Sequence, residues 1–95
     1  MPAYVIVQIA VHDPVTYERY RQLSGPSLVP FGGRFIVRGG ALETMEGTWH
    51  PGRLVILEFP DTAAARAWWA SPEYADGKAH RQASANTEML LVDGV

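Results

Sequence analysis

The sequence predicts an α+β fold in which a four-stranded antiparallel sheet is covered by helices on one face. Two observations lead to this prediction. Short apolar segments rich in β-branched residues alternate along the 95 residues with longer segments that open on helix-capping residues. The order strand, helix, strand occurs twice, and a chain of this length is one domain by size, so residues 1–95 are expected to fold together.

The first quarter of the chain predicts a buried strand followed by a helix. Residues 4–11, YVIVQIAV, are apolar except for one glutamine, which is typical of a strand buried on both faces. Asp13 precedes Pro14, and this pair indicates a helix start, because aspartate caps a first turn and proline suits the first helical position. The helix is expected to run from Pro14 to Leu23, or as far as Val29.

The segment GGRFIVRGG, residues 32–40, predicts a short second strand that carries two arginines. Successive side chains of a regular strand point to opposite faces. We therefore expect one face to hold Arg34, Ile36 and Arg38, and the other to hold Phe35 and Val37. The glycine pairs indicate a bend, beyond which the strand could continue into residues 41–46.

The second half of the chain predicts a strand, a kinked helical region and a last strand. Residues 53–59, RLVILEF, are the third strand. A helix is expected over residues 62–70 and another over 72–84, because Ser71 before Pro72 indicates a second capped start. Residues 88–94 complete the sheet.

The resulting order, β-α-β-β-α-β, is the ferredoxin-like unit, in which both helical segments cover the same face of the sheet. Strands one, three and four are nevertheless apolar on both faces. An uncovered apolar face is unfavourable in water, and the simplest remedy is a second copy packed sheet to sheet. We therefore expect a homodimer with a closed, barrel-like interior.

Composition excludes several classes of function. The formal net charge is -2, and the eight basic residues are scattered, so nucleic-acid binding is not expected. No apolar run approaches the roughly 20 residues that a bilayer requires. The chain has no cysteine, which removes thiol chemistry, and its beginning does not resemble an export signal, so a cytoplasmic location is expected.

Five motifs, in this order and at these spacings, resemble the family called domain of unknown function 1330: DPVTYERY, GGRFIVRGG, WHPGRLVILEFPD, AWWASPEY and LLVDGV. That family belongs to the dimeric α+β barrel superfamily, so the resemblance implies this fold and a dimer. Other members of the superfamily include cofactor-free monooxygenases, lactone isomerases and haem-handling proteins. Fold alone therefore selects no chemistry.

Arg38 and Glu58 are the candidate catalytic pair. A guanidinium is always charged and suits a carboxylate or phosphate, and Glu58 lies on the strand expected to be adjacent. One interpretation has Arg38 anchoring an anionic substrate while Glu58 acts as a base or orients it. The other is a structural ion pair or an edge charge. Gln8, the polar interruption of the first strand, could join either arrangement.

Aromatic residues and a histidine complete the candidate substrate-binding set, which comprises Trp49, His50, Trp68, Trp69 and Tyr74. Adjacent tryptophans on a helix point about 100° apart, so Trp68 and Trp69 cannot both enter one core. The hydroxyls of three further tyrosines could also reach a cavity, although packing is their simpler role: Tyr4, Tyr17 and Tyr20.

The sequence gives no signal for a metal or a cofactor. Its three histidines are far apart and lack ligand spacing, so no metal is expected and a haem-handling role is not favoured. The first functional hypothesis is a homodimer that binds a small anionic or aromatic metabolite between sheet and helices, as a cofactor-free isomerase or monooxygenase-like enzyme. The alternative is a non-catalytic dimerisation or regulatory module whose Arg38 and Glu58 are structural.

Overall fold

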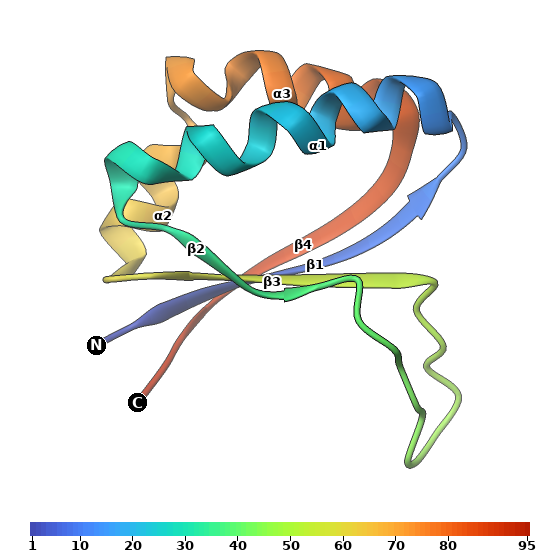
Figure 1. Cartoon of the computed structure of the whole chain (residues 1–95). Helices are drawn as coiled ribbons and strands as arrows, with labels where there is room; N and C mark the ends of the chain where they lie inside the picture. Colours follow the sequence, from blue (N-terminus) through green and yellow to red (C-terminus); the bar gives the residue numbers. More distant parts are fainter.

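A single four-stranded antiparallel sheet organises the computed structural model, which describes residues 1–95, and its strands lie in the order β2-β3-β1-β4 (Figure 1). The elements follow the chain as β1 (Ala3–Val11), α1 (Pro14–Leu28), the 3-10 turn η1 (Val29–Phe31), β2 (Arg34–Arg38), β3 (Arg53–Phe59), α2 (Thr62–Trp69), α3 (Pro72–Ser84) and β4 (Ala85–Asp93). The predicted α+β ferredoxin-like fold is confirmed.

The helices begin where capping residues were identified. Asp13 accepts hydrogen bonds from the backbone N–H of Thr16 at 3.2 Å and from its hydroxyl at 2.6 Å. Ser71 accepts a hydrogen bond from the backbone N–H of Tyr74 at 3.1 Å, which separates α3 from α2. Helix α1 extends to Leu28, the longer of the two predictions, and it includes Pro26 in its last turn.

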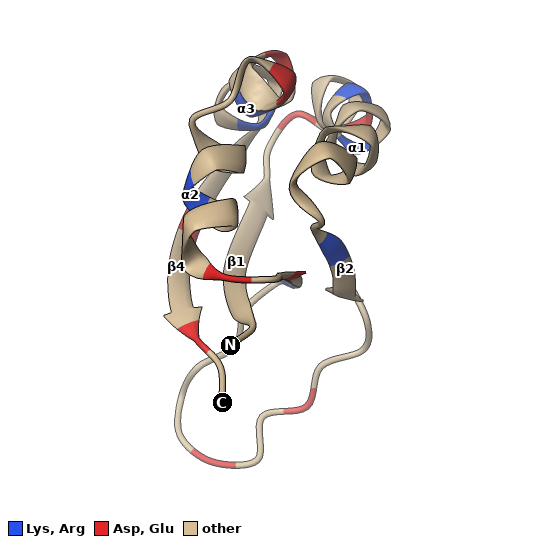
Figure 2. Ribbon diagram, turned by 90° about the vertical axis from the view of Figure 1, so that its left-hand side faces the viewer, with Lys and Arg blue, Asp and Glu red and all other residues tan.

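All three α-helices cover one face of the sheet and leave the other uncovered (Figures 1 and 2). The core lies between these two layers. From the sheet come Val5, Val7, Ile9, Val55, Leu57 and Phe59, and from the helices Tyr17, Tyr20, Leu28, Ala65, Trp68 and Tyr74. Gly33 fits this core closely, because a Cβ there would stand 2.6 Å from the ring of Phe59.

A β-bulge in β2 overturns the predicted assignment of its faces. Phe35 is paired with Leu57 of β3 and Val37 with the preceding residue, Ile56, so Ile36 has no partner. The extra residue reverses the alternation: Phe35 and Arg38 face the helices, whereas Arg34 faces away. The bulge lies within the strand rather than at the glycine pair, and β2 ends at Arg38, so residues 39–52 form a loop.

The uncovered face of the sheet is apolar at its centre, as the sequence suggested, and Glu58, Gln8 and Glu88 lie around that centre. Pairing places Ile6 between Ile56 and Leu90, and Leu54 lies on the same face opposite Gln8. Leu90 is 67% exposed. The loop 39–52 also extends from this side, away from the helices (Figure 1). None of the helices combines the length and the hydrophobicity that a membrane span requires.

Candidate functional site

A pocket lies between the helix-facing side of the sheet and α1. Its walls are mainly apolar, and its fourteen lining residues are Val7, Ile9, Tyr17, Tyr20, Arg21, Ser24, Leu28, Phe35, Arg38, Arg53, Val55, Leu57, Trp68 and Met89. The cavity measures about 10 Å³, which is the space of one water molecule. The side chains at its mouth therefore close it in this conformation.

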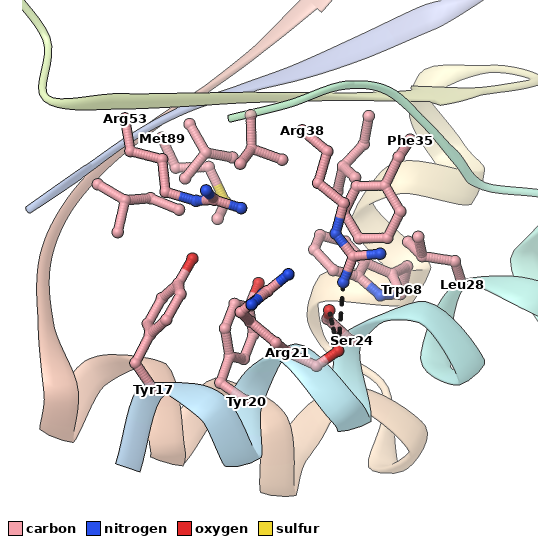
Figure 3. A pocket seen from close by; sticks show the side chains of 14 residues that line it. Tyr17, Tyr20, Arg21, Ser24, Leu28, Phe35, Arg38, Arg53, Trp68 and Met89 are labelled. Carbon is pink, nitrogen blue, oxygen red and sulfur yellow. Dashed lines mark hydrogen bonds between the residues drawn. The ribbon is translucent and has the colours of Figure 1, made fainter. Parts of the chain in front are cut away.

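Three arginines from three elements converge on this pocket (Figure 3). Arg21 extends from α1, Arg38 from β2 and Arg53 from the first position of β3. All three remain charged at any physiological pH, and a guanidinium has donors but no acceptor. No aspartate, glutamate or histidine lines the pocket. The pocket lining therefore concentrates positive charge, and no residue of the lining neutralises it.

Arg38 is held at the pocket by two weak contacts. Its guanidinium lies over the ring of Phe35, with Cζ 4.1 Å from the ring centroid. Its Nη2 donates a hydrogen bond to the backbone carbonyl of Arg21 at 3.2 Å, and the side chain is exposed (Figure 3). These contacts orient the head without neutralising its charge.

Arg53 reaches the pocket across Gly39, the glycine that follows β2. Gly39 has φ 71°, and a Cβ there would stand 2.6 Å from the guanidinium carbon of Arg53, so glycine serves both the turn and the close approach. The Nε of Arg53 is buried and has no hydrogen-bond partner. Such a group in a folded protein calls for a water or a ligand.

Of the three pocket arginines, Arg21 is the one that contacts a carboxylate. It pairs with Glu18 at 3.2 Å, one turn earlier on α1, and both side chains are about half exposed. Exposed pairs of this kind contribute at most about 1 kcal/mol. Two further acidic residues, Glu43 and Glu46, belong to the loop 39–52, which extends away from the helices (Figure 1).

Two tyrosines of α1, Tyr17 and Tyr20, line the pocket beside the arginines (Figure 3). The hydroxyls of Tyr20 and Tyr74 are 3.2 Å apart, and Tyr74 accepts a hydrogen bond from the Nε of Arg81 at 3.1 Å. Burial, with a smaller contribution from Tyr74, raises the pKa of Tyr20 well above its usual range. Tyr20 therefore stays protonated wherever the chain is folded.

The structure separates Arg38 from Glu58, contrary to the suggested contact. Glu58 lies on the uncovered face, where Arg34 donates to it through Nε at 2.8 Å. The bulge at Ile36 is the cause, because it turns Arg38 toward the helices while Arg34 stays opposite Glu58. The ion pair exists, but its arginine is Arg34.

The other predicted residues are divided between the two faces. Trp49 donates to Gln8 at 2.7 Å on the uncovered side, and His50 lies within hydrogen-bond distance of Thr44 in the loop, at 2.9 Å. Trp68 lines the pocket, and its ring packs 4.0 Å from that of Tyr74, centroid to centroid.

Trp69 lies at the surface, where Lys78 stacks on its ring at 3.8 Å. One tryptophan of the adjacent pair is therefore core, and its neighbour is not. No three histidine, aspartate or glutamate side chains lie close enough together to hold a metal ion.

Sequence reasoning did not assign four polar residues of the pocket to a binding role: Tyr17, Tyr20, Arg21 and Arg53. The signal for three of them was present, since positions 17, 20, 21 and 24 share one helical face. Arg53 carried no local signal, because its role depends on the register of β3 and the turn at Gly39.

Fold and site together define a ferredoxin-like α+β protein with an arginine-lined pocket. The chain belongs to the family described as a domain of unknown function, DUF1330, whose model matches residues 2–95. No curated protein matches the sequence.

Solved structures share the fold at low sequence identity. A protein of unknown function from Rhodopseudomonas palustris, RPA0582, has a TM-score of 0.80 and 20% identity, over 99% of this chain and 82% of that one. A dimeric ferredoxin-like protein of unknown function from Jannaschia sp. CCS1 has a TM-score of 0.70 and 18% identity, over 99% of this chain and 100% of that one. SnoaB, a cofactor-independent oxygenase from Streptomyces nogalater, has a TM-score of 0.67 and 15% identity, over 99% of this chain and 93% of that one.

The raised pKa of Tyr20 predicts an alkaline loss of stability. The folded chain keeps this proton where the unfolded chain releases it, above the ordinary tyrosine value of 10.0. The contribution is complete below pH 10 and falls above it by about 1.4 kcal/mol per pH unit. Urea unfolding at pH 8 to 11 should show a steeper decline of the free energy of unfolding with pH for wild type than for Tyr20→Phe. Equal slopes for wild type and Tyr20→Phe would contradict the burial argument.

Proposed function

We propose that the chain binds a small anionic metabolite, with an aromatic or other planar apolar part, in the pocket between the sheet and α1. The observation that carries this proposal is the convergence of Arg21, Arg38 and Arg53 on a pocket without an acidic lining residue. Like charges close together repel, and the repulsion grows where solvent is excluded. A bound anion replaces that repulsion with attraction and also supplies an acceptor for the unpartnered Nε of Arg53.

The remainder of the pocket suits an apolar or aromatic group. Phe35, Leu28, Trp68 and Met89 surround the space behind the guanidinium heads. Because the cavity is about 10 Å³, a ligand enters by displacing those heads toward solvent. Arg38 and Arg21 are free to move in this way, since each is exposed and held by contacts that are individually weak.

Arg38 keeps its proposed role as an anion anchor, and Trp68 keeps its role as an apolar wall. Tyr74 does not line the pocket, but its ring packs against that of Trp68 and its hydroxyl forms a hydrogen bond with that of Tyr20. Glu58, Gln8, Trp49 and His50 stay outside this pocket proposal, because they lie on the opposite face of the sheet or in the loop.

A catalytic role as a cofactor-free isomerase or monooxygenase-like enzyme is the second candidate. The likeness in fold to SnoaB, a cofactor-independent oxygenase, favours it only as an analogy. The pocket of one chain contributes charge stabilisation, which suits an enolate or phenolate, and it provides no carboxylate or imidazole that would take a proton. On this proposal the substrate arrives as an anion, and the arginines and tyrosines stabilise its charge.

Ligand-observed NMR with a panel of aromatic and aliphatic carboxylates tests the anchor. Arg38→Gln should weaken a wild-type ligand about tenfold or more, since it removes a charge-assisted hydrogen bond. Arg34→Gln is the matched control, on the same strand but the opposite face, and should bind as wild type. Equal binding by wild type and Arg38→Gln would refute the anchor role. A lower melting temperature with no ligand for either protein would support the structural module instead.

We propose further that two copies associate through the uncovered sheet face and form the closed α+β barrel. The face offers the apolar side chains of Ile6, Leu54, Ile56, Leu90 and Val92, which one chain leaves in water. A similar structure, that from Jannaschia sp. CCS1, is described as dimeric. The helix-side pocket and this face lie on opposite sides of the sheet, so association leaves the pocket mouth open.

Light scattering after size exclusion tests the dimer. Wild type should have twice the 10.5 kDa mass of one chain. Leu90→Glu should give a single-chain mass, because it buries a charge in the interface while altering a side chain that is 67% exposed in one chain. Val15→Glu, on the helix side and 83% exposed, should remain dimeric. A single-chain mass for wild type would exclude this association.

A further inference from the structure

A chain of three polar side chains crosses the core from α3 to the pocket. Arg81 of α3 is 5% exposed, and no acidic side chain is paired with it. Its Nε lies 3.1 Å from the hydroxyl oxygen of Tyr74, and that oxygen lies 3.2 Å from the hydroxyl oxygen of Tyr20. Tyr20 in turn lines the pocket beside Arg21 (Figure 3).

The direction of hydrogen bonding along this chain follows from the inventory of donors and acceptors. A guanidinium has no acceptor, so Arg81 donates to Tyr74. The hydroxyl proton of Tyr74 then has a single acceptor within reach, the oxygen of Tyr20, because Tyr74 is 0% exposed and makes no other side-chain hydrogen bond. The reverse arrangement would leave that buried proton without a partner, which is costly.

The consequence lies at the pocket. Once the oxygen of Tyr20 accepts from Tyr74, the proton of Tyr20 has no acceptor in the protein and is available on the pocket side. The burial that raises the pKa of Tyr20 keeps this proton in place. The pocket thus holds a neutral donor next to the three cationic ones.

We propose that Arg81 acts through Tyr74 to fix the hydroxyl proton of Tyr20 toward the pocket, so that Tyr20 donates to an unprotonated oxygen of a bound oxyanion. This inference rests on the proposed anion site and adds to it the ligand's chemistry at one position. An unprotonated oxygen of a carboxylate, sulfate or hydrogen phosphate accepts this hydrogen bond, whereas the P–OH proton of hydrogen phosphate finds no acceptor at Tyr20. Arg81 and Tyr74 are positioning residues, and Tyr20 is a binding residue.

Sulfate and phosphate are suitable probes, because at pH 7 phosphate carries at least one proton and sulfate carries none. Titrations followed by NMR at low salt give the affinity of each anion and their ratio. The hydroxyls of Tyr17 and Ser24 also line the pocket and can accept a proton, so the test compares ratios between variants. Tyr20→Phe should weaken sulfate about tenfold, since it removes a donor to a charged group.

Tyr74→Phe frees the oxygen of Tyr20 to accept a hydrogen bond from the P–OH group of phosphate. The ratio of sulfate affinity to phosphate affinity should therefore fall at least threefold, while the affinity for sulfate changes by a smaller factor. Arg81→Gln supplies an acceptor to Tyr74 and should shift the ratio in the same direction, whereas Arg81→Lys keeps a donor and should retain it. Tyr4→Phe, on the uncovered face, is the matched control and should match wild type. A merely structural role for Tyr74 would lower both affinities equally.

The outcomes separate this inference from the proposed function. Wild type that binds neither anion would refute the anion site and the inference with it. Wild type that binds sulfate through Arg38, combined with ratios unchanged in both Tyr74→Phe and Arg81→Gln, would leave the anion site standing and overturn the role of Tyr20. A shifted ratio in either variant that remains folded, with Tyr4→Phe unchanged, supports the inference.

Discussion

The bulge at Ile36 determines which charges meet in this fold. It adds one residue to a five-residue edge strand, so Arg34 and Arg38 point to opposite faces of the sheet. Arg34 is answered by Glu58 on the uncovered face, while Arg38 enters the helix side, where no carboxylate lines the pocket. A regular strand would place both arginines on the face that carries Glu58. The pocket would then have two guanidiniums, those of Arg21 and Arg53.

The two faces of the sheet are suited to different tasks. The helix side combines apolar walls with cationic and hydroxyl donors, which is the combination that the proposed anion site requires. The uncovered side is apolar at its centre and charged toward its edge, which is the composition of an association surface. The polar chain from Arg81 through Tyr74 to Tyr20 connects the pocket to α3, so the orientation of a hydroxyl at the pocket depends on residues that do not line it.

Much of the fold was predictable, because local signals determine it. Asp13 and Ser71 cap the helices as expected, and the apolar segments pair in ferredoxin-like order. The site was less predictable. The bulge changes how β2 pairs with β3, and no residue type in β2 marks it. The alternation of side chains along the sequence therefore could not reveal that Arg38 and Glu58 lie on opposite faces. The approach of Arg53 across Gly39 depends on strand register and on a turn, and both are tertiary features.

The central claim, that three guanidiniums form an anion site, is tested most directly by a crystal structure determined with sodium sulfate. The account predicts tetrahedral density within hydrogen-bond distance of Arg21, Arg38 and Arg53, with the hydroxyl of Tyr20 turned toward it. Guanidinium heads that point into solvent or pair with a carboxylate of a second copy, around a pocket holding only water, would contradict it.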